Sequence, residues 1–348
     1  MDPFRCRCRR ESGRRTILAA TRLITLLMLL AVLPQPAIGQ NLSQDSVKGV
    51  VQVDALIPGD ARSASSLGTE RVGTGVLIDD SGLIVTIGYL ILEASEVTIS
   101  GAGPDAVPAT ILAYDHESGF GLIRASQPLD VAPVGLGNST ALQPMQPLLV
   151  VSHAGDLDAT GVYLVDRREF AGYWEYLLED ALFTSPPHAK FGGAALIDQE
   201  GRLVGIGSLF VNDAGREAGG QGRTVPGNMF VPIDGLKSIM GDLLSRGRRA
   251  DPGRPWLGLT MEEHRGRVIV TKVSPDGPAE AAGIEPNDVI LGVDGVPVHG
   301  LGDLYRKLWS RGEAGVAVPL DVLQGIEVKP VIVESTDRYR YLRLDPTF

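Results

Sequence analysis

Residues 73–86 read GTGVLIDDSGLIVT, in which two short apolar runs are separated by the polar residues Asp79–Gly82. Short apolar runs on both sides of such a turn are typical of a β-hairpin. Further short apolar runs follow at residues 97–99, 109–112, 121–124, 148–151, 162–165, 195–197 and 203–206. Strands this short and this regularly spaced predict β-barrels or a β-sandwich, so we expect a mainly β fold.

The composition is that of a folded protein with more than one domain. The chain has 348 residues, of which 44% are hydrophobic and 21% are charged, an ordinary globular balance. Its 43 glycines and 23 prolines are spread along the whole length, which favours short strands joined by many turns over long helices. A chain of this length predicts two domains.

The sequence pattern changes near residue 234. Apolar residues there recur three and four positions apart, which predicts a helix over residues 234–246 with Asp234 as its N-cap. These apolar residues are Leu236, Ile239, Met240, Leu243 and Leu244. After it, strands are expected at residues 268–270, 289–291 and 320–323, and helices at residues 278–282 and 303–310. We therefore expect a helix that closes a β domain, followed by a small α/β domain.

These changes divide the chain into five parts. The polar, serine-containing residues before residue 71 are interpreted as a loop-like entry segment, and the charged, Gly- and Pro-rich residues after the helix as a linker. The predicted parts are an export signal (1–39), an N-terminal segment (40–70), the β domain (71–245), the linker (246–254) and the small domain (255–345).

Residues 1–39 have the features of a secretory signal. Seven arginines lie within the first 22 residues, an apolar stretch follows from Leu23 to Leu33, and Ala37 and Gly39 offer small residues for cleavage. The apolar stretch is short for crossing a bilayer, so we expect cleavage rather than an uncleaved membrane anchor. Both outcomes place the remaining chain outside the cytoplasm, and the periplasm is the expected compartment.

Cleavage would also change the thiol content and the charge. Both cysteines, Cys6 and Cys8, precede the apolar stretch, so the remaining chain would have no disulfide, thiolate metal site or cysteine nucleophile. Of the 32 basic and 42 acidic residues, seven and two lie in residues 1–39, which leaves a net charge of about −15. We expect no nucleic-acid partner for such an acidic chain. The sequence shows no metal-ligand spacing and no phosphate-binding glycine loop, so no cofactor or metal is expected.

Two groups of motifs resemble one known family. Residues 73–86 and 228–234 resemble, in order and separation, the hairpin that leads to the catalytic histidine and the last strand of the trypsin-like domain of HtrA-type serine proteases. Residues 256–259, 273–284 and 288–295 resemble the carboxylate-binding loop, the first-helix region and the following strand of the PDZ domain in that family. The resemblance implies a trypsin-like double β-barrel followed by a PDZ-like α/β domain.

The resemblance also locates the three catalytic positions. Carried over position by position, the histidine falls on Tyr89, the aspartate on Gly119 and the serine on Phe191. A serine protease needs an attacking hydroxyl, an imidazole that takes its proton and a carboxylate that orients the imidazole. A phenol with a pKa of about 10 is a poor base at neutral pH, glycine has no side chain, and phenylalanine has no nucleophile. The resemblance therefore implies a catalytically degenerate member, with no catalytic residues among these three.

An active site rearranged to other residues is the alternative. The candidate pairs are Ser185 with His188, Ser152 with His153, and His116 beside Asp115. Neighbouring residues of a strand point to opposite faces, which argues against Ser152 with His153. The prolines between Ser185 and His188 stiffen their loop without supplying an oxyanion hole. This loop also looks about two residues shorter than in the family, so we expect a poor oxyanion hole.

The PDZ-like domain carries the expected binding function. A PDZ domain adds a peptide as an extra strand and holds the terminal carboxylate on backbone N–H groups. Residues 257–259 (Leu257, Gly258 and Leu259) would supply these groups, with Trp256 beside them as a ligand contact or a packing residue. Leu304 and Leu308, one helical turn apart, would line the pocket for the last apolar side chain of the peptide, or would belong to the core instead.

Together these features predict an exported pseudoprotease that binds unfolded or C-terminal peptide segments, in protein quality control or in regulation of active HtrA-like proteases. The first alternative is an active serine endopeptidase with a rearranged catalytic site. The second is a structural subunit that assembles with active HtrA-like proteases. Members of the family often form trimers through their N-terminal segment, which makes residues 40–70 the candidate segment for a homo-oligomer.

Overall fold

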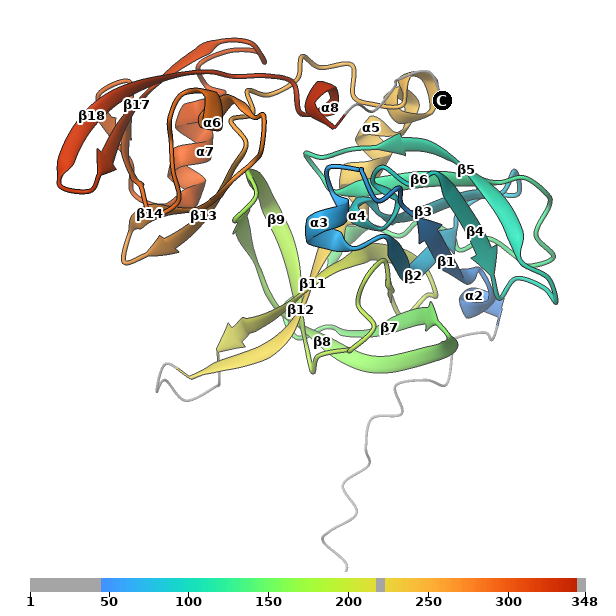
Figure 1. Ribbon diagram of the computed structural model, residues 1–348. Coiled ribbons are helices and arrows are strands. Elements are labelled where there is room, and N and C mark those ends of the chain that lie inside the picture. Colours follow the sequence, from blue (N-terminus) through green and yellow to red (C-terminus); the bar gives the residue numbers. More distant parts are fainter. Residues whose placement is uncertain (1–44, 217–222, 343–348) are drawn as a thin grey trace, which may run out of the picture. The chain divides into compact units, whose positions relative to one another are not determined.

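The computed structural model describes residues 45–216 and 223–342, which all belong to the compact unit Asn41–Phe348. The strands between residues 50 and 232 form two closed barrels (Figure 1). The first barrel has the order β1-β2-β3-β6-β5-β4, and the second has the order β10-β11-β12-β9-β8-β7. Each apolar run that predicted a strand lies in one, apart from Ile78 at the end of the first run. The mainly β fold class is confirmed.

The bounds of the first six strands are β1 Val50–Leu56, β2 Glu70–Leu77, β3 Leu83–Ile87, β4 Glu96–Ser100, β5 Val107–Tyr114 and β6 Phe120–Ala125. Those of the second six are β7 Pro147–Ala154, β8 Asp156–Gly172, β9 Tyr176–Ser185, β10 Ala195–Ile197, β11 Leu203–Arg216 and β12 Thr224–Pro232. The short helices α2 Asp45–Lys48, α3 Ala64–Leu67, α4 Gly88–Ile91 and η1 Ser139–Ala141 lie between them.

The interpretation of residues 40–70 as a loop-like segment is wrong for residues 50–56. This stretch is β1, which pairs with both β2 and β4 and so completes the first barrel. Its sequence VVQVDAL alternates buried and half-buried side chains, as expected for a strand with one face in a core. The signal is weak in the sequence because a single short alternation is surrounded by polar residues.

The buried apolar side chains of the barrels form two main clusters, and the one inside the first barrel extends to strands of the second. Alternating residues of β1, including Val51 and Val53, pack with Ile84, Phe120 and Leu122 inside the first barrel. The interior of the second barrel is a cluster of buried apolar side chains from several strands and one loop. It comprises Leu142, Leu148, Val150, Val162, Leu164, Leu182, Ala194, Leu196, Val204 and Phe230.

Helix α5 (Ile233–Arg246) follows the second barrel and buries Leu236, Ile239 and Leu243 against the cluster that fills the first barrel. Leu244, expected on the same face, is largely exposed. Pro232 rather than Asp234 is the N-cap residue. The Asp234 carboxylate instead accepts hydrogen bonds from the backbone N–H of Thr140 and from the hydroxyl of Ser139. It therefore ties the start of α5 to η1.

The C-terminal module is a sheet with helices packed on it, with the strand order β13-β14-β15-β17-β18 and β16 paired to β15. Helix α7 (Leu301–Trp309) buries four side chains in the module's apolar cluster, namely Leu301, Leu304, Tyr305 and Leu308. The remaining elements are β13 Leu259–His264, β14 Arg267–Val273, α6 Pro278–Ala281, β15 Val289–Val293, β16 Val296–Pro297, β17 Ala317–Gln324, β18 Glu327–Glu334 and α8 Arg338–Tyr341.

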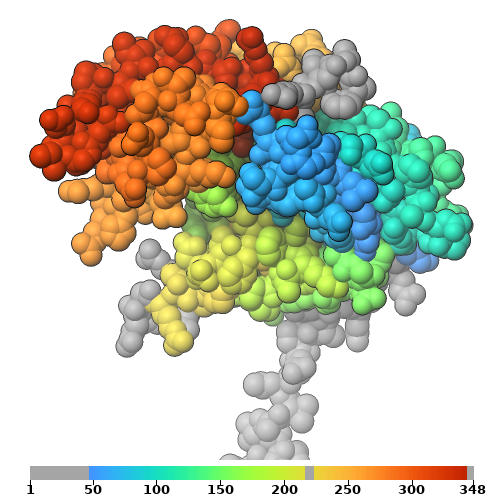
Figure 2. Space-filling model, in the orientation of Figure 1, coloured from blue at the N-terminus to red at the C-terminus, as the bar shows by residue number. Residues whose placement is uncertain are grey.

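The module contacts the segment around α3. Arg62 donates a hydrogen bond of 3.0 Å to the carbonyl of Pro275, and its guanidinium lies 4.1 Å from the ring centre of Tyr341. In the space-filling view the blue and orange segments touch at this side of the molecule (Figure 2). Within the described residues, none of the helices combines the length and the apolar character needed to cross a bilayer.

Candidate functional site

The three positions predicted to correspond to the catalytic triad lie in one region of the structure. Tyr89 is in α4, Gly119 is in the turn between β5 and β6, and Phe191 precedes β10. The N–H of Gly88 donates to the carbonyl of Gly119 over 2.7 Å. A Cβ placed on Gly192 would lie 3.0 Å from the Tyr89 hydroxyl. Residues far apart in the sequence therefore meet here.

The groups at these positions differ from those of an acyl-transfer site. The Tyr89 hydroxyl donates to the carbonyl of Ser208 over 3.0 Å, and burial raises the pKa of this phenol further above its ordinary value. It stays protonated at neutral pH and cannot act as the base. A side chain built on Gly119 would start 3.5 Å from the Tyr176 hydroxyl, and Phe191 offers only a ring.

A serine and a histidine meet elsewhere, in the second barrel. The hydroxyl of Ser152 lies 2.7 Å from Nε2 of His188, and the hydroxyl of Thr160 lies 2.8 Å from Nδ1 of the same ring. Burial lowers the pKa of His188, although the charge of Asp158 acts in the opposite direction. The position that a carboxylate occupies in a triad is thus held by a hydroxyl, which cannot stabilise an imidazolium by charge.

This pair differs from the pairs predicted from the sequence. His188 bonds to Ser152 rather than to Ser185, whose hydroxyl donates to the carbonyl of Pro226. The backbone N–H of His153 donates to the hydroxyl of Thr74. Ser152 is fully buried and His188 is only 2% exposed, so the pair lies inside the fold rather than at an open cleft.

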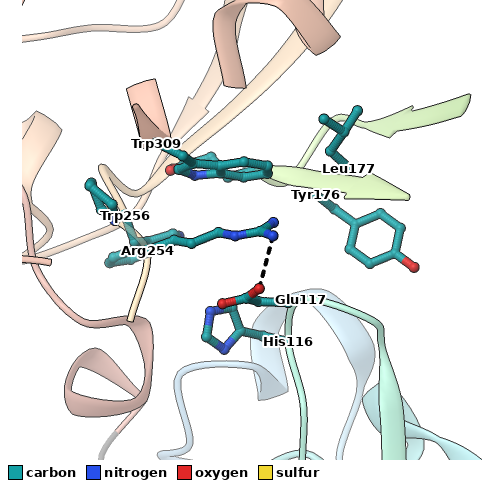
Figure 3. A pocket seen from close by; sticks show the side chains of 9 residues that line it. His116, Glu117, Tyr176, Leu177, Arg254, Trp256 and Trp309 are labelled. Carbon is teal, nitrogen blue, oxygen red and sulfur yellow. Dashed lines mark ion pairs between the residues drawn. The ribbon is translucent and has the colours of Figure 1, made fainter. Parts of the chain in front are cut away.

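His116 lies in a different environment from that of a catalytic base. Figure 3 shows it in a pocket beside Glu117, where Arg254 is held between the Glu117 carboxylate and the ring of Trp309. Arg254 is 3.0 Å from Glu117 and 4.3 Å from the ring centre of Trp309. Burial, together with the nearby charge of Arg338, lowers the pKa of His116 to about 3, so its ring is neutral at pH 7. The neighbouring Asp115 is already ion-paired with Arg249.

Three backbone donors converge on a carboxylate at the start of the C-terminal module. The N–H groups of residues 257–259 all point to Glu175, which belongs to the turn between β8 and β9. The Leu257 N–H is 3.0 Å from one oxygen, and the N–H groups of Gly258 and Leu259 are 2.7 and 2.8 Å from the other. Gly258 has a φ of +84°, a left-handed conformation that glycine adopts without strain. The loop thus has the geometry of an anion-binding nest.

The two leucines of α7 lie deep in the module. Leu304 is 2% exposed and Leu308 is fully buried, and both belong to the apolar cluster that also contains Leu177 of β9. They are core residues, and they share their cluster with a side chain from outside the module. Trp256 packs on Tyr341 with ring centres 4.4 Å apart, and its backbone forms a bridge with Thr336. Among the described residues, the structure shows no cluster of side chains that could ligate a metal.

Comparisons with known proteins agree with this two-part organisation. Residues 73–206 match the trypsin-like peptidase domain family, and residues 255–334 match the PDZ domain family. Protease Do-like 1, chloroplastic, of Arabidopsis thaliana is 26% identical over 277 residues, which cover 73% of this chain and 61% of that protein. The periplasmic pH-dependent serine endoprotease DegQ of Escherichia coli is 25% identical over 281 residues, which cover 77% and 59%. The chain thus combines a trypsin-like peptidase domain with one PDZ domain, and the relatives that it resembles are Do-like and DegQ-type serine proteases.

Solved structures of HtrA-type proteins show the same fold. The HtrA-type protease AlgW with a tripeptide has a TM-score of 0.51 at 17% identity, covering 87% of this chain and 98% of that one. The same protease with a decapeptide also has a TM-score of 0.51, at 18% identity and with coverage of 86% and 98%. The chain spans about three fifths of the length of the curated relatives given above.

Sequence reasoning missed two residues of this site, Glu175 and Tyr305. The Tyr305 hydroxyl is buried and donates to the carbonyl of Gly172 over 2.6 Å, while the Glu175 N–H lies 3.3 Å from the same hydroxyl. Neither residue could be recognised as a site residue from the sequence, because their hydrogen-bond partners lie more than 80 positions away in the chain. One local signal existed: the three-residue turn Tyr173–Glu175 contains no glycine, although such hairpin turns usually place one at the left-handed position.

Proposed function

We propose that this chain is an HtrA-like pseudoprotease of the periplasm that binds polypeptide segments through its PDZ domain, in protein quality control or in regulation of active relatives. The observation that carries this proposal is that the three N–H groups of residues 257–259 all donate hydrogen bonds to the carboxylate of Glu175. A loop that satisfies a buried carboxylate has the chemistry needed for the carboxylate at the end of a peptide. The AlgW structures described above carry short peptides by name, which supports the same binding mode.

The proposal of lost catalysis rests on the side chains at the three triad positions. Tyr89 is a protonated phenol bonded to a backbone carbonyl, Gly119 has no side chain, and Phe191 has no hydroxyl. Each change removes one required role, and none of the three residues can take over the role of another. We therefore propose that peptide bound by this chain is held or presented rather than cut.

Peptide binding is expected to depend on a free C-terminal carboxylate. A short fluorescein-labelled peptide that ends in an apolar residue with a free carboxylate should bind at least about tenfold more tightly than the same peptide with a C-terminal amide. The neutral amide would leave N–H groups of residues 257–259 poorly paired, a loss of about 1.4 kcal/mol or more. Fluorescence anisotropy measures both affinities. Equal affinities for the two peptides would show that this loop is not the binding site.

An active endopeptidase is the second candidate, because Ser152 and His188 are within hydrogen-bonding distance. Several features argue against it: both side chains are buried, and a hydroxyl from Thr160 stands where a carboxylate is needed. The relatives are named as proteases, which keeps this alternative open to test.

A fluorophosphonate probe is expected to leave the purified chain unlabelled, because only an activated and accessible serine reacts. Unfolded casein should likewise stay intact during incubation. An active HtrA-type protease serves as the positive control, and Ser152→Ala serves as the variant control. Labelling that disappears in Ser152→Ala, together with casein cleavage that disappears in it, would establish the enzymatic alternative and reject the pseudoprotease.

The remaining proposals concern place and assembly. Relatives such as DegQ are named as periplasmic, which supports the periplasm as the proposed compartment. The acidic charge of the chain argues against nucleic-acid binding at long range. The proposed export signal (1–39) lies outside the described residues. Trimer formation and association with active HtrA-like proteases stay proposals, which co-purification with such a protease would test.

A further inference from the structure

The turn between β8 and β9 occupies the edge of the PDZ sheet where a peptide strand would be added. Strand β13 is at the edge of that sheet, with β14 as its neighbour. On its open side, the N–H of Met261 donates to the carbonyl of Tyr173 over 2.8 Å. Addition of a backbone segment to such an edge is the way in which PDZ domains bind peptides. The β8–β9 turn therefore makes a backbone contact that a bound peptide would make.

The Glu175 side chain makes a second contact that a bound peptide would make. Its carboxylate accepts hydrogen bonds from the three N–H groups of residues 257–259. It therefore lies where the terminal carboxylate of a bound peptide would lie. The residue itself is only 5% exposed, and burial raises the pKa of the carboxyl, although the N–H groups and the charge of Arg338 act in the opposite direction. A buried charge of this kind is costly without partners, so Glu175 depends on this loop.

The backbone at Glu175 is also held in a conformation that is unusual for this residue type. Its φ is +55°, in the left-handed region where a side chain is disfavoured and glycine is common. The neighbouring Trp174 carbonyl accepts a bond of 3.3 Å from Arg338. An observed backbone outlier that aims a charged group into a binding loop points to a role in that loop.

The same hairpin also supplies an apolar side chain, two residues after Glu175. Leu177 is 8% exposed and packs in the cluster that contains Leu304 and Leu308. The Tyr305 hydroxyl holds the base of the same turn by its bonds to residues 172 and 175. The turn thus offers a carboxylate, a strand-like backbone contact and an apolar anchor to the same domain.

We propose that residues 172–177, at the tip of the β8–β9 hairpin, are an internal ligand that closes the PDZ groove to outside peptides. This proposal rests on the peptide-binding function proposed above and adds its regulation. A peptide with a free C-terminal carboxylate binds after the tip has withdrawn, so its apparent affinity is reduced by the fraction of molecules that are closed. Because the tip belongs to the second barrel, peptide binding and the position of this hairpin are coupled in both directions.

The test compares full-length wild type with Glu175→Gly and Glu175→Gln. Glycine removes the carboxylate and suits the left-handed backbone, while glutamine keeps the shape and removes the charge. Glu179→Gln, at an exposed position of strand β9, which follows the turn, is the matched control. The probe is the labelled peptide with a free C-terminal carboxylate, read by anisotropy. Both Glu175 variants should bind it at least about tenfold more tightly than wild type, and Glu179→Gln should bind like wild type.

Amide hydrogen exchange of the wild-type chain, with and without peptide, is a second test of the same closure. Saturating peptide should increase exchange at residues 172–177, because the tip must leave the groove. Equal peptide affinity in wild type and both Glu175 variants would overturn internal closure and leave the peptide-binding function standing. Failure of every form to prefer the free carboxylate over the amide would instead reject the peptide-binding function and this inference with it.

Discussion

Replacing Asp115 by alanine is expected to lower the free energy of unfolding by about 3 kcal/mol or more. The Asp115 side chain is 1% exposed, and one of its oxygens lies 2.8 Å from Nη2 of Arg249. It also accepts bonds from the hydroxyl and N–H of Ser118. Removing it leaves the Arg249 guanidinium, itself 23% exposed, without its main partner. Urea-induced unfolding of wild type and variant measures the change.

A surface ion pair supplies the control for this prediction. Asp213 lies 3.3 Å from Arg168, but its side chain is 64% exposed. Asp213→Ala is therefore expected to cost less than about 1 kcal/mol, because water solvates and screens exposed charges. If Asp115→Ala costs no more than Asp213→Ala, the link between the β5–β6 turn and the segment after α5 contributes little to stability, contrary to the structure.

The same pair has a defined pH dependence. Burial opposes ionisation of Asp115, but the hydrogen bonds and charge of Arg249 outweigh it and hold the pKa of the carboxyl below its ordinary value. The resulting stabilisation is present above the unfolded pKa, about 3.9, and is lost as the pH falls through the lower folded pKa. Wild type should therefore lose more stability than Asp115→Ala on acidification below about pH 4. Parallel acid-unfolding curves for the two proteins would contradict this assignment.

The local pattern of the chain predicted most of the fold, because most barrel strands are short apolar runs bounded by polar turns that can be recognised in the sequence. The hairpin of residues 73–86 became β2 and β3, with a turn in which the Asp79 carboxylate accepts the N–H groups of Ser81 and Leu83. A polar turn between apolar runs is a local feature, so the sequence shows it. Strand β1 was harder to predict, since its identity depends on pairing with β2 and β4 rather than on any turn beside it.

The candidate site was predictable only where a motif is continuous in the sequence. Residues 257–259 could be proposed as a carboxylate-binding loop because the whole loop is local. The group that fills it, Glu175, is 82 residues away from Leu257 and lies in a turn with no expected role. The bond between Ser152 and His188 is also non-local, because the two residues come from a strand and from a loop of the same barrel. From their proximity in the sequence, Ser152 was considered with His153 and His188 with Ser185.

Replacing Gly193 by alanine is expected to destabilise the chain by about 4 kcal/mol or to prevent folding. Gly193 has a φ of +75°, and a Cβ there would lie 2.0 Å from the carbonyl oxygen of Thr74 and 2.7 Å from the Thr86 hydroxyl. Neither atom can withdraw easily, because the Thr86 hydroxyl donates to the Thr74 carbonyl across paired strands β2 and β3. The loop that carries Phe191 would have to move away from the first barrel.

Gly266→Ala separates the two causes of this loss. Gly266 has the same φ of +75°, but a Cβ there would meet nothing within 4 Å. Its substitution should cost only the backbone strain, about 1 to 2 kcal/mol. Urea unfolding of both variants, with soluble yield and limited proteolysis for Gly193→Ala, gives the comparison. A similar cost for the two would mean that residues 191–193 do not lie against β2, and the positions of Phe191 and Tyr89, on which the proposed loss of catalysis depends, would have to be reassigned.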